Sequence, residues 1–589
     1  MMSPEEIRAR ILDEVSKHGG HLASSLGAVE IAIALREEFD PWRDRIIWDV
    51  GHQAYAWKIL TGRAKEFSTL RELDGISGFP NPLESKCDAA IAGHAGVALS
   101  IAEGYATARK LQHKDYHVVA ITGDSSLVNG TSLEALNNCA AAGKVILVLN
   151  DNGMSISKPA GSFSRFLGRL IAGARYNRLK NAARRWGKAM RLYFLYGFVH
   201  RFKARIKSWF LADSFFEQFG FRYIGPVNGH DVKALRAAFA VAKQESRSVI
   251  VHVVTKKGKG WQVAEKDPTS WHGPGPFDIA NPAAFLEKAK NAYTWSRAFG
   301  EALASLAAED EKIVALSAGM KDGTGLEEFA SAYPERFFDV GIAEGHMFSF
   351  ASGLAAGGMK SVIAVYSTFL QRAIDQLLHD IAIANLPVVV CVDRAGVVGQ
   401  DGVTHQGLYD IAMTKCIPNL TICQPKDAAD LKALLKEALE RKGPTLIRYP
   451  RGIAPTGNEP ETFTEEVFTP QENGWVIYAC GDMYKKACDV AKAVGGKAVY
   501  SRYIKPFDEE SLSRYREQGE RIASIENGCV AGGLGESIGA DLKFGWPDEF
   551  IPHGKTAELE KRYHLDVDSI VAKIKSFTPQ SKGKAKIQI

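Results

Sequence analysis

The sequence predicts an α/β protein with parallel sheets, arranged as three domains along the chain. Short apolar, β-branched runs alternate with longer segments of helix-forming residues through most of its length. One strand, one helix and a second strand fit within residues 116–150, which requires a parallel crossover. The length of 589 residues is also too great for one hydrophobic core.

The composition is that of an ordinary globular protein. Apolar residues make up 46% and charged residues 24% of the chain, and a net charge of +5 argues against general nucleic-acid binding. The amino terminus has acidic residues and no apolar signal region, and no apolar run reaches the roughly 20 residues of a membrane span. The eight cysteines form no Cys-x-x-Cys pair and are expected to be small buried residues in a reducing compartment. We therefore expect a cytoplasmic protein with no nucleic-acid partner and no stable membrane insertion.

The order of the elements predicts three domains, residues 1–281, 282–455 and 456–589. Two Pro- and Gly-rich stretches, 273–282 and 452–463, are the expected linkers. The predicted strands share an apolar, β-branched composition and comprise 44–50, 116–122, 144–150 and 248–255, then 312–317, 361–367, 387–393 and 420–425, then 474–481, 497–504 and 520–526.

The clearest unit is the crossover in the first domain. The strand 116–122 stops at Gly123, helix formers run from 131 to 142, and Gly143 is expected to close that helix in a left-handed conformation before the strand 144–150.

Two polar side chains follow these strands. Parallel strands end at the same edge of a sheet, where ligands bind, so Asp124 and Asn152 are expected in one crevice. Carboxylate and amide oxygens suit a divalent cation that keeps phosphate oxygens as its other ligands. Helix caps or Asx-turns are the simpler alternative for an isolated pair of this kind.

The segment 162–209 contains thirteen Lys or Arg and no acidic residue, interleaved with aromatic residues. It could attract an anionic membrane or a nucleic acid. A solvated helical segment over the mouth of the first domain is the interpretation we favour, because Lys and Arg stems often cover apolar surface.

Several motifs occur in a fixed order. They are Gly19–Gly27, Trp48–Arg63, Gly123–Asn152, Val340–Gly358, Tyr366–Asp380, Asp393–Gly407 and Arg448–Gly452. Together they resemble the 1-deoxy-D-xylulose-5-phosphate synthase family of transketolase-like, thiamine-diphosphate-dependent enzymes, from about residue 4 to residue 573.

The resemblance implies a three-domain transketolase-like fold. Two parallel-sheet domains bind thiamine diphosphate, the first through diphosphate and metal and the second through the pyrimidine, and a C-terminal α/β domain follows. It also implies a homodimer and a transferase that condenses pyruvate with D-glyceraldehyde 3-phosphate, giving 1-deoxy-D-xylulose 5-phosphate and CO2. This reaction would serve isoprenoid and thiamine biosynthesis, with Mg²⁺ as the metal.

The same resemblance assigns the cofactor site. Asp124, Asn152 and the Met154 carbonyl would bind the metal, and Glu344 would hydrogen-bond the pyrimidine and promote loss of the cofactor's C2 proton. The Gly- and Ala-rich surroundings of Glu344 favour its burial over a surface position. The full implied cofactor-binding set is His52, Gly93, His94, Ala95, Asp124, Ser125, Ser126, Asn152, Trp261, Lys266, Glu344, Tyr366 and Phe369.

Histidines and arginines complete the implied site. Proton transfer is assigned to His52, His405, His21 and His272 beside Glu344, although any single histidine is more often structural. Substrate contacts are assigned to Arg372, Arg394, Asp401 and Arg451, with a helix ion pair and an Asp-Gly turn as the alternatives for Arg372 and Asp401.

The chain departs from the family pattern at a few positions. Ser125-Ser126 replace Gly-Ala, Ala95-Gly96 replace Ser-Ser, and Trp261 replaces a tyrosine. The glycine lost at Ser125 matters if the backbone there needs positive φ to approach the diphosphate. Three alternatives to the main hypothesis remain: another transketolase-like acyloin synthase, a non-catalytic cofactor-binding paralogue, and a module whose function lies in the basic segment.

Overall fold

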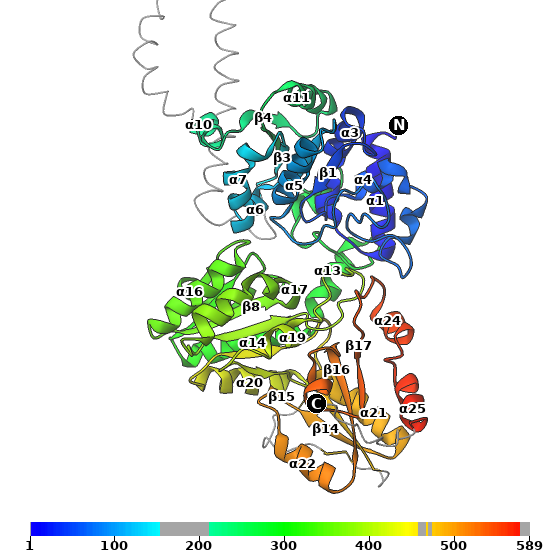
Figure 1. Cartoon of the computed structure of the whole chain (residues 1–589), viewed down its shortest axis with the longest axis vertical. Helices are drawn as coiled ribbons and strands as arrows, with labels where there is room; N and C mark the ends of the chain where they lie inside the picture. The colour runs from blue at the N-terminus through cyan, green and yellow to red at the C-terminus, as the bar shows by residue number, and fades with distance from the viewer. Residues whose placement is uncertain (1, 154–210, 458–466, 469–473, 578–589) are drawn as a thin grey trace, which may run out of the picture. The chain divides into compact units, whose positions relative to one another are not determined.

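The described chain forms two compact units, each with parallel sheet covered by helices (Figure 1). The first contains the described residues up to Ala292 together with Ser317–Lys321 and Asp339–Glu344, and the second contains the rest. The predicted α/β class is confirmed. The computed structural model describes residues 2–153, 211–457, 467–468 and 474–577.

The first unit has a five-stranded sheet in the order β1-β2-β3-β5-β4, and every neighbouring pair is parallel. Its strands are β1 (Arg45–Trp48), β2 (Val118–Gly123), β3 (Ile146–Asp151), β4 (Arg222–Asn228) and β5 (Val249–Val254). Since all of them point the same way, their carboxyl ends form one edge, as the sequence predicts.

Helices cover both faces of this sheet because successive strand residues point to opposite sides. Val119 and Ile121 of β2 pack with α3 and α11, whereas Val118 and Ala120 pack with α5 and α7. The α-helices of the unit are α1 (Pro4–His18), α2 (Leu22–Gly27), α3 (Val29–Glu38), α4 (Tyr55–Lys58), α5 (Ala98–Leu111), α6 (Asp124–Leu127), α7 (Gly130–Ala142), α10 (Leu211–Gln218), α11 (Val232–Gln244), α12 (Gln262–Lys266) and α13 (Pro282–Asn291). Shorter π and 3₁₀ turns, η1 (Ile59–Arg63) and η2 (Glu66–Thr69), follow α4.

The predicted crossover is present as β2, α7 and β3, but the expected role of Gly143 is wrong in one respect. Its φ of 151° and ψ of 174° are not those of a left-handed helical cap. A Cβ at this glycine would lie 3.1 Å from the carbonyl oxygen of Ala106, on the neighbouring helix α5. The glycine is therefore required by a close helix approach and by an extended exit toward β3.

The second unit contains a seven-stranded sheet in the order β15-β10-β11-β9-β8-β6-β7. Its strands are β6 (Ile313–Ser317), β7 (Phe337–Asp339), β8 (Lys360–Tyr366), β9 (Val389–Asp393), β10 (Thr421–Cys423), β11 (Thr445–Arg448) and β15 (Tyr503–Lys505). Its α-helices are α14 (Trp295–Glu309), α15 (Glu327–Ala332), α16 (Glu344–Ala356), α17 (Ser367–Leu370), α18 (Ile374–Gln376), α19 (Asp410–Thr414) and α20 (Ala428–Glu440), and its π and 3₁₀ turns are η5 (Pro334–Arg336), η6 (Gln371–Ala373) and η7 (Leu377–Ala382).

A second five-stranded sheet, ordered β12-β14-β13-β16-β17, completes this unit. Its strands are β12 (Val467–Phe468), β13 (Trp475–Cys480), β14 (Lys497–Ser501), β16 (Arg521–Cys529) and β17 (Leu542–Trp546). The short turn η8 (Gly481–Met483) and the helices α21 (Tyr484–Val494), α22 (Glu509–Glu517), α23 (Leu534–Ser537), α24 (Thr556–Arg562) and α25 (Val567–Lys575) accompany it. The core of this layer joins α21 and α25 to β13 and β16.

The single strand predicted over 497–504 is wrong. The chain forms β14, then turns at Arg502, and β15 adds antiparallel to β10 of the seven-stranded sheet. Arg502 forms an ion pair of 2.8 Å with buried Asp430, and its carbonyl accepts the Gln424 amide. Because Arg502 is fixed by these contacts, β14 ends before it and β15 begins after it. The sequence itself has no turn residue at this position.

No disulfide joins the eight cysteines. Six of them are buried as expected, Cys488 is half-buried and Cys416 is exposed. Across the described ranges, no helix combines the length and the apolar character required to cross a membrane. The basic segment 162–209 and Met154 lie outside the described residues.

Candidate functional site

The carboxyl edge of the first sheet gathers the predicted metal-binding side chains. Asp124 follows β2 directly, and Asn152 follows β3. Lys257 comes three residues after the end of β5, and its loop is fixed because the Thr255 amide donates to the Asp151 carbonyl at 2.9 Å. The ends of β2 and β3 and the loop after β5 thus contribute polar side chains to one edge of the sheet.

Asp124 is a buried carboxylate with charged neighbours. Its pKa is raised to about 7, chiefly by burial and also by the nearby Asp151, while Lys257 opposes both effects. Burial lowers the pKa of Lys257 to about 8, while Asp124 holds it up. A second positive charge at this edge would stabilise the ionised carboxylates, because two buried like charges repel each other strongly.

The turn after β3 has a defined shape. The Gly153 amide donates to Oδ1 of Asp151 at 3.0 Å, and Gly153 has a φ of 67°. This Asx-turn fixes the backbone around Asn152, which is half-buried.

Asp49, which follows β1, organises the loop that contains Gly93, His94 and Ala95. Its buried carboxylate accepts the amides of Gly96, Val97 and Ala98 at 2.9, 3.0 and 3.0 Å. Burial raises the pKa of Asp49, and these hydrogen bonds oppose the rise. The loop is therefore held at the same sheet edge as Asp124.

The substitutions in this region impose no backbone strain at the serines. Ser125 and Ser126 lie in α6, and neither has positive φ. The Ser125 hydroxyl is buried and finds no hydrogen-bond partner within the described part of the chain. Gly96 does need its glycine, since its φ is 85° and a Cβ would lie 2.5 Å from Oδ1 of Asn129.

Three of the predicted histidines form one cluster in the first unit. The ring centroids of His21 and His52 are 5.9 Å apart, those of His52 and His272 are 5.2 Å apart, and those of His21 and His272 are 5.7 Å apart. Phe79 packs 5.1 Å from His21. Such a cluster of imidazoles can accept and return protons near neutral pH.

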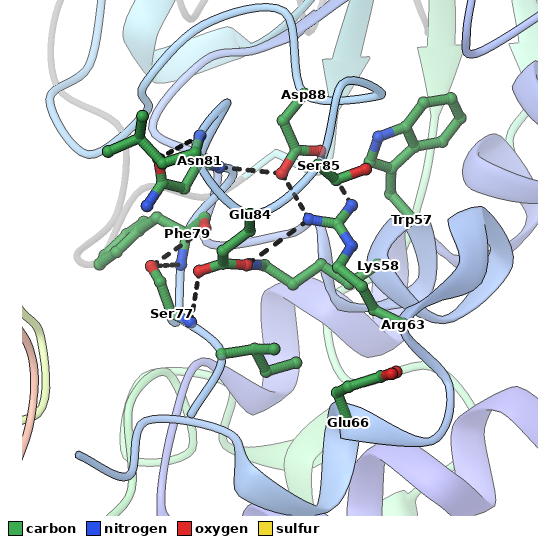
Figure 2. A network of polar contacts seen from close by, with 12 residues as sticks. Trp57, Lys58, Arg63, Glu66, Ser77, Phe79, Asn81, Glu84, Ser85 and Asp88 are labelled. Carbon is green, nitrogen blue, oxygen red and sulfur yellow. Dashed lines mark hydrogen bonds and ion pairs between the residues drawn. The ribbon is translucent and has the colours of Figure 1, made fainter. Parts of the chain in front are cut away.

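A buried ion-pair network supports the loop that carries Phe79 and leads to His94. Figure 2 shows Lys58 and Arg63 reaching toward Glu84 and Asp88. Arg63 binds both oxygens of Asp88, at 2.5 and 2.9 Å, and Lys58 binds Glu84 at 2.6 Å.

The same two carboxylates also accept hydrogen bonds from the loop backbone. Glu84 accepts the amide of Ser77 at 2.6 Å, and Asp88 accepts the amide of Asn81 at 2.8 Å. The network thus fixes a long segment without helix or strand by charge-assisted hydrogen bonds.

Trp261 and Lys266 follow the glycine-containing loop after β5, Trp261 directly before α12 and Lys266 at its end. The Trp261 ring packs against Trp271 and Phe277, at centroid distances of 4.7 and 5.6 Å. Lys266 ends α12 and is exposed. The aromatic contacts of Trp261 are sufficient to explain its position without a cofactor.

Within the second unit, the predicted aromatic wall and one histidine come together. The rings of Tyr366 and Phe369 stack at 5.6 Å, and His405 meets Phe369 edge-on at 5.9 Å. The Arg394 guanidinium lies 3.9 Å from the Tyr366 centroid. Burial raises the pKa of Tyr366 to about 12, so the ring stays neutral beside this cation.

Two predicted substrate residues contact each other in the same unit. Arg451 donates to Asp401 at 3.2 Å and to the Val398 carbonyl at 3.2 Å. Arg394 has a φ of 59°, which few residues other than glycine adopt and which is often found at functional sites. Arg372, in η6, is half-buried.

Glu344 is buried, with only 4% of its surface exposed, as the apolar sequence around it predicts. It begins α16, and the segment before it belongs to the first unit. There the Asn129 side-chain amide donates to the Ile342 carbonyl at 2.9 Å, and Asp339 accepts the Gly341 amide at 3.0 Å. The backbone leading to Glu344 is therefore fixed.

Four residues of this edge escaped prediction from the sequence: Asp49, Asp151, His252 and Lys257. Position gave a usable signal for three of them, since Asp49, Asp151 and Lys257 lie at or just after strand ends. His252 lies inside β5, and an interior strand position gives no such signal. Among the described residues, no cluster of three or more His, Cys, Asp or Glu side chains is arranged to hold a metal ion.

The comparisons with known proteins agree on one family. Residues 2–255 match the family described as 1-deoxy-D-xylulose-5-phosphate synthase, and residues 291–456 match the transketolase pyrimidine-binding domain. A relative from Clostridium kluyveri named 1-deoxy-D-xylulose-5-phosphate synthase is 44% identical over 595 residues, 97% of this chain and 94% of the relative. A relative of the same name from Caldanaerobacter subterraneus is 43% identical over 597 residues, 96% of this chain and 94% of the relative.

A solved transketolase from Campylobacter jejuni aligns over 98% of both chains at 18% identity, with a TM-score of 0.44, which is too low to support an inference. The family match and the full-length relatives agree: this chain belongs to the 1-deoxy-D-xylulose-5-phosphate synthase family and has its transketolase-like α/β fold.

Proposed function

We propose that the protein is a thiamine-diphosphate-dependent transferase that condenses pyruvate with D-glyceraldehyde 3-phosphate, giving 1-deoxy-D-xylulose 5-phosphate and CO2. The observation that carries this proposal is the relative of that name that aligns with 97% of the chain at 44% identity. The arrangement of charged groups in each unit supports it.

The first unit fits a diphosphate held through Mg²⁺. The carboxylate of Asp124 and the amide oxygen of Asn152 are hard donors at one sheet edge, and the Met154 carbonyl is proposed as a third. The buried Ser125 hydroxyl can donate to the diphosphate, and Lys257 adds positive charge. Gly93, His94, Ala95, Ser126, Trp261 and Lys266 are proposed to line the rest of the cofactor.

Thiamine diphosphate supplies, when bound, an acidic carbon that adds to the keto group of pyruvate and stabilises the charge left when CO2 departs. Glu344 is proposed to hydrogen-bond the pyrimidine, for which its burial and its fixed backbone are suited. Tyr366 and Phe369 offer a flat apolar wall for that ring.

The histidines are proposed to transfer protons. His21, His52 and His272 lie close enough together to protonate and deprotonate substrate oxygens in turn. His405 is proposed to act similarly from beside Phe369.

The phosphate group of the acceptor substrate is expected to bind positively charged side chains. Arg394 and Arg451 present guanidinium groups that bind phosphate through paired donors, and Arg372 is proposed as a third. Asp401, held by Arg451 at 3.2 Å, can accept hydrogen bonds from the acceptor's hydroxyl groups.

The proposal extends to the organisation of the protein. The predicted domains 1–281, 282–455 and 456–589 would bind diphosphate and metal, bind the pyrimidine, and complete the fold, respectively. A cytoplasmic homodimer that serves isoprenoid and thiamine biosynthesis is proposed from the family membership.

Release of CO2 from pyruvate, with and without D-glyceraldehyde 3-phosphate, tests the proposal. We expect CO2 only when thiamine diphosphate, Mg²⁺ and both substrates are present. Turnover with a ketose donor but not with pyruvate would indicate a transketolase, and cofactor binding without turnover of either would indicate a non-catalytic paralogue.

A further inference from the structure

A chain of three buried or half-buried side chains ends at the turn that presents Asn152. The hydroxyl of Tyr223 lies 2.7 Å from Nδ1 of His252, and Nε2 of His252 lies 2.9 Å from Oδ2 of Asp151. His252 has 0% of its surface exposed and Asp151 has 2%. The other oxygen of Asp151 accepts the Gly153 amide.

The sheet register brings these side chains to one face. Leu149 of β3 pairs with His252 of β5, and the Asp151 side chain lies two residues beyond Leu149 on the same face. Tyr223 of β4 packs against the same core, with its ring 5.9 Å from that of Phe216 and nearly parallel to it. A Cβ on Gly225 would lie 2.6 Å from the His252 carbonyl, so the β4 backbone also confines this histidine.

The hydrogen bonds select one tautomer of His252. An ionised carboxylate can only accept a hydrogen bond, so Nε2 carries the ring proton and donates to Asp151, and the tyrosine hydroxyl donates to Nδ1. Both oxygens of Asp151 are then used, one by His252 and one by the Gly153 amide. The carboxylate cannot rotate without losing one of them, and the Asx-turn around Asn152 is locked.

We propose that His252, held by its hydrogen bond with Tyr223, is a positioning residue that orients Asp151 and thereby preorganises the turn that presents Asn152 to the metal. This inference rests on the proposed function, because it concerns the Mg²⁺ site assigned there. In this proposal His252 and Tyr223 act only through the Asp151 carboxylate and do not bind the metal themselves. Residues that orient metal-binding groups typically change metal affinity by about 10–100-fold when they are replaced.

Calorimetric titration of Mg²⁺ into the full chain, at a fixed excess of thiamine diphosphate, tests the proposal. His252→Asn removes the donor to Asp151, and we expect the Mg²⁺ dissociation constant to rise by about 10-fold or more. Tyr223→Phe removes only one hydroxyl and keeps the ring stack, and we expect a rise of about fivefold, the effect of one hydrogen bond. The unfolding midpoint of each variant without cofactor is measured alongside.

Tyr116→Phe is the matched control. Its hydroxyl donates to the Tyr105 carbonyl at 3.2 Å, before β2 and away from Asp151. We expect unchanged Mg²⁺ affinity in this variant. If His252→Asn does not fold, Tyr223→Phe decides the question.

Mg²⁺ affinity within twofold of the unmodified chain in the folded variants would overturn the positioning role. An equal loss in Tyr116→Phe, in step with the unfolding midpoint, would also overturn it. No binding of Mg²⁺ and cofactor to the unmodified chain would contradict the proposed function itself, and the positioning role with it.

Discussion

At the scale of single residues, buried carboxylates at strand ends are the most informative feature of this protein. Asp49, Asp124 and Asp151 follow or end strands of the first sheet, and Asp393 ends β9 of the second unit. Each is almost fully buried, which is expensive unless hydrogen bonds or cations compensate. Such groups tie the stability of the fold to pH.

Asp393→Asn should change the pH dependence of stability. Burial raises the pKa of Asp393 to about 6, above the value near 3.8 of the unfolded chain. The unfolded state therefore loses its proton first as pH rises, and folded stability falls between about pH 4 and pH 6. Asparagine cannot ionise and can still accept the Ser296 hydroxyl that Asp393 binds at 2.6 Å.

Thermal unfolding at pH 4.5 and pH 7 measures this effect. We expect the midpoint of Asp393→Asn, relative to the unmodified chain, to be higher at pH 7 than at pH 4.5, by the equivalent of at most about 3 kcal/mol. Exposed Asp548→Asn is the matched control and should show no such change. A constant difference across pH would show that folding does not raise the pKa of Asp393.

At the scale of elements, one long segment without regular structure is held by charge. Between η2 and α5, residues 70–97 contain neither helix nor strand, yet they carry Phe79 and His94. Lys58 and Arg63 fix this segment through Glu84 and Asp88 (Figure 2).

We expect the Asp88→Ala variant to unfold at a lower midpoint than the unmodified chain. The substitution removes the carboxylate that binds the buried Arg63 cation and accepts the Asn81 amide, and removing one partner of a buried pair costs about 3–5 kcal/mol. Asp115→Ala is the control, since the Arg43–Asp115 pair is exposed and its loss should not shift the unfolding midpoint measurably. Equal midpoints for the two variants would contradict the anchoring role of the network.

Gly96→Ala tests the loop that Asp49 holds. The φ of 85° and the contact of 2.5 Å with Asn129 should make an added Cβ cost about 1–3 kcal/mol and weaken cofactor binding. Gly104→Ala, in the following helix α5, meets nothing within 4 Å and should stabilise the protein slightly. Urea unfolding of both variants measures the difference, and an undamaged Gly96→Ala would show that this loop can relax.

The elements that the sequence predicts best are those with strong local periodicity. β2, α7 and β3 follow from apolar strands around a run of helix formers, and they place Asp124 and Asn152 at one edge. The division of 497–504 between two sheets depends on the ion pair of Arg502 with Asp430, which is distant in sequence. His252 is a similar case, because only the register of β3 and β5 brings it to Asp151.

At the scale of the whole molecule, family membership and geometry lead to one account of function. The groups proposed to bind the diphosphate lie in the first unit, while Tyr366, Phe369, Arg394 and His405 lie in the second. The account requires that Glu344 serve the same cofactor that Asp124 and Asn152 hold. A glutamate in that role accelerates loss of the cofactor's C2 proton, so the proton itself reports on the arrangement.

The exchange rate of the C2 hydrogen of bound thiamine diphosphate for deuterium, followed by NMR after acid quenching, is the most direct test. At saturating cofactor and Mg²⁺, we predict exchange about 100-fold slower or more in Glu344→Gln. Half-exposed Glu301→Gln, which removes a surface partner of Arg297, should exchange as the unmodified chain does. Equally fast exchange in Glu344→Gln, with the cofactor fully bound, would contradict the account.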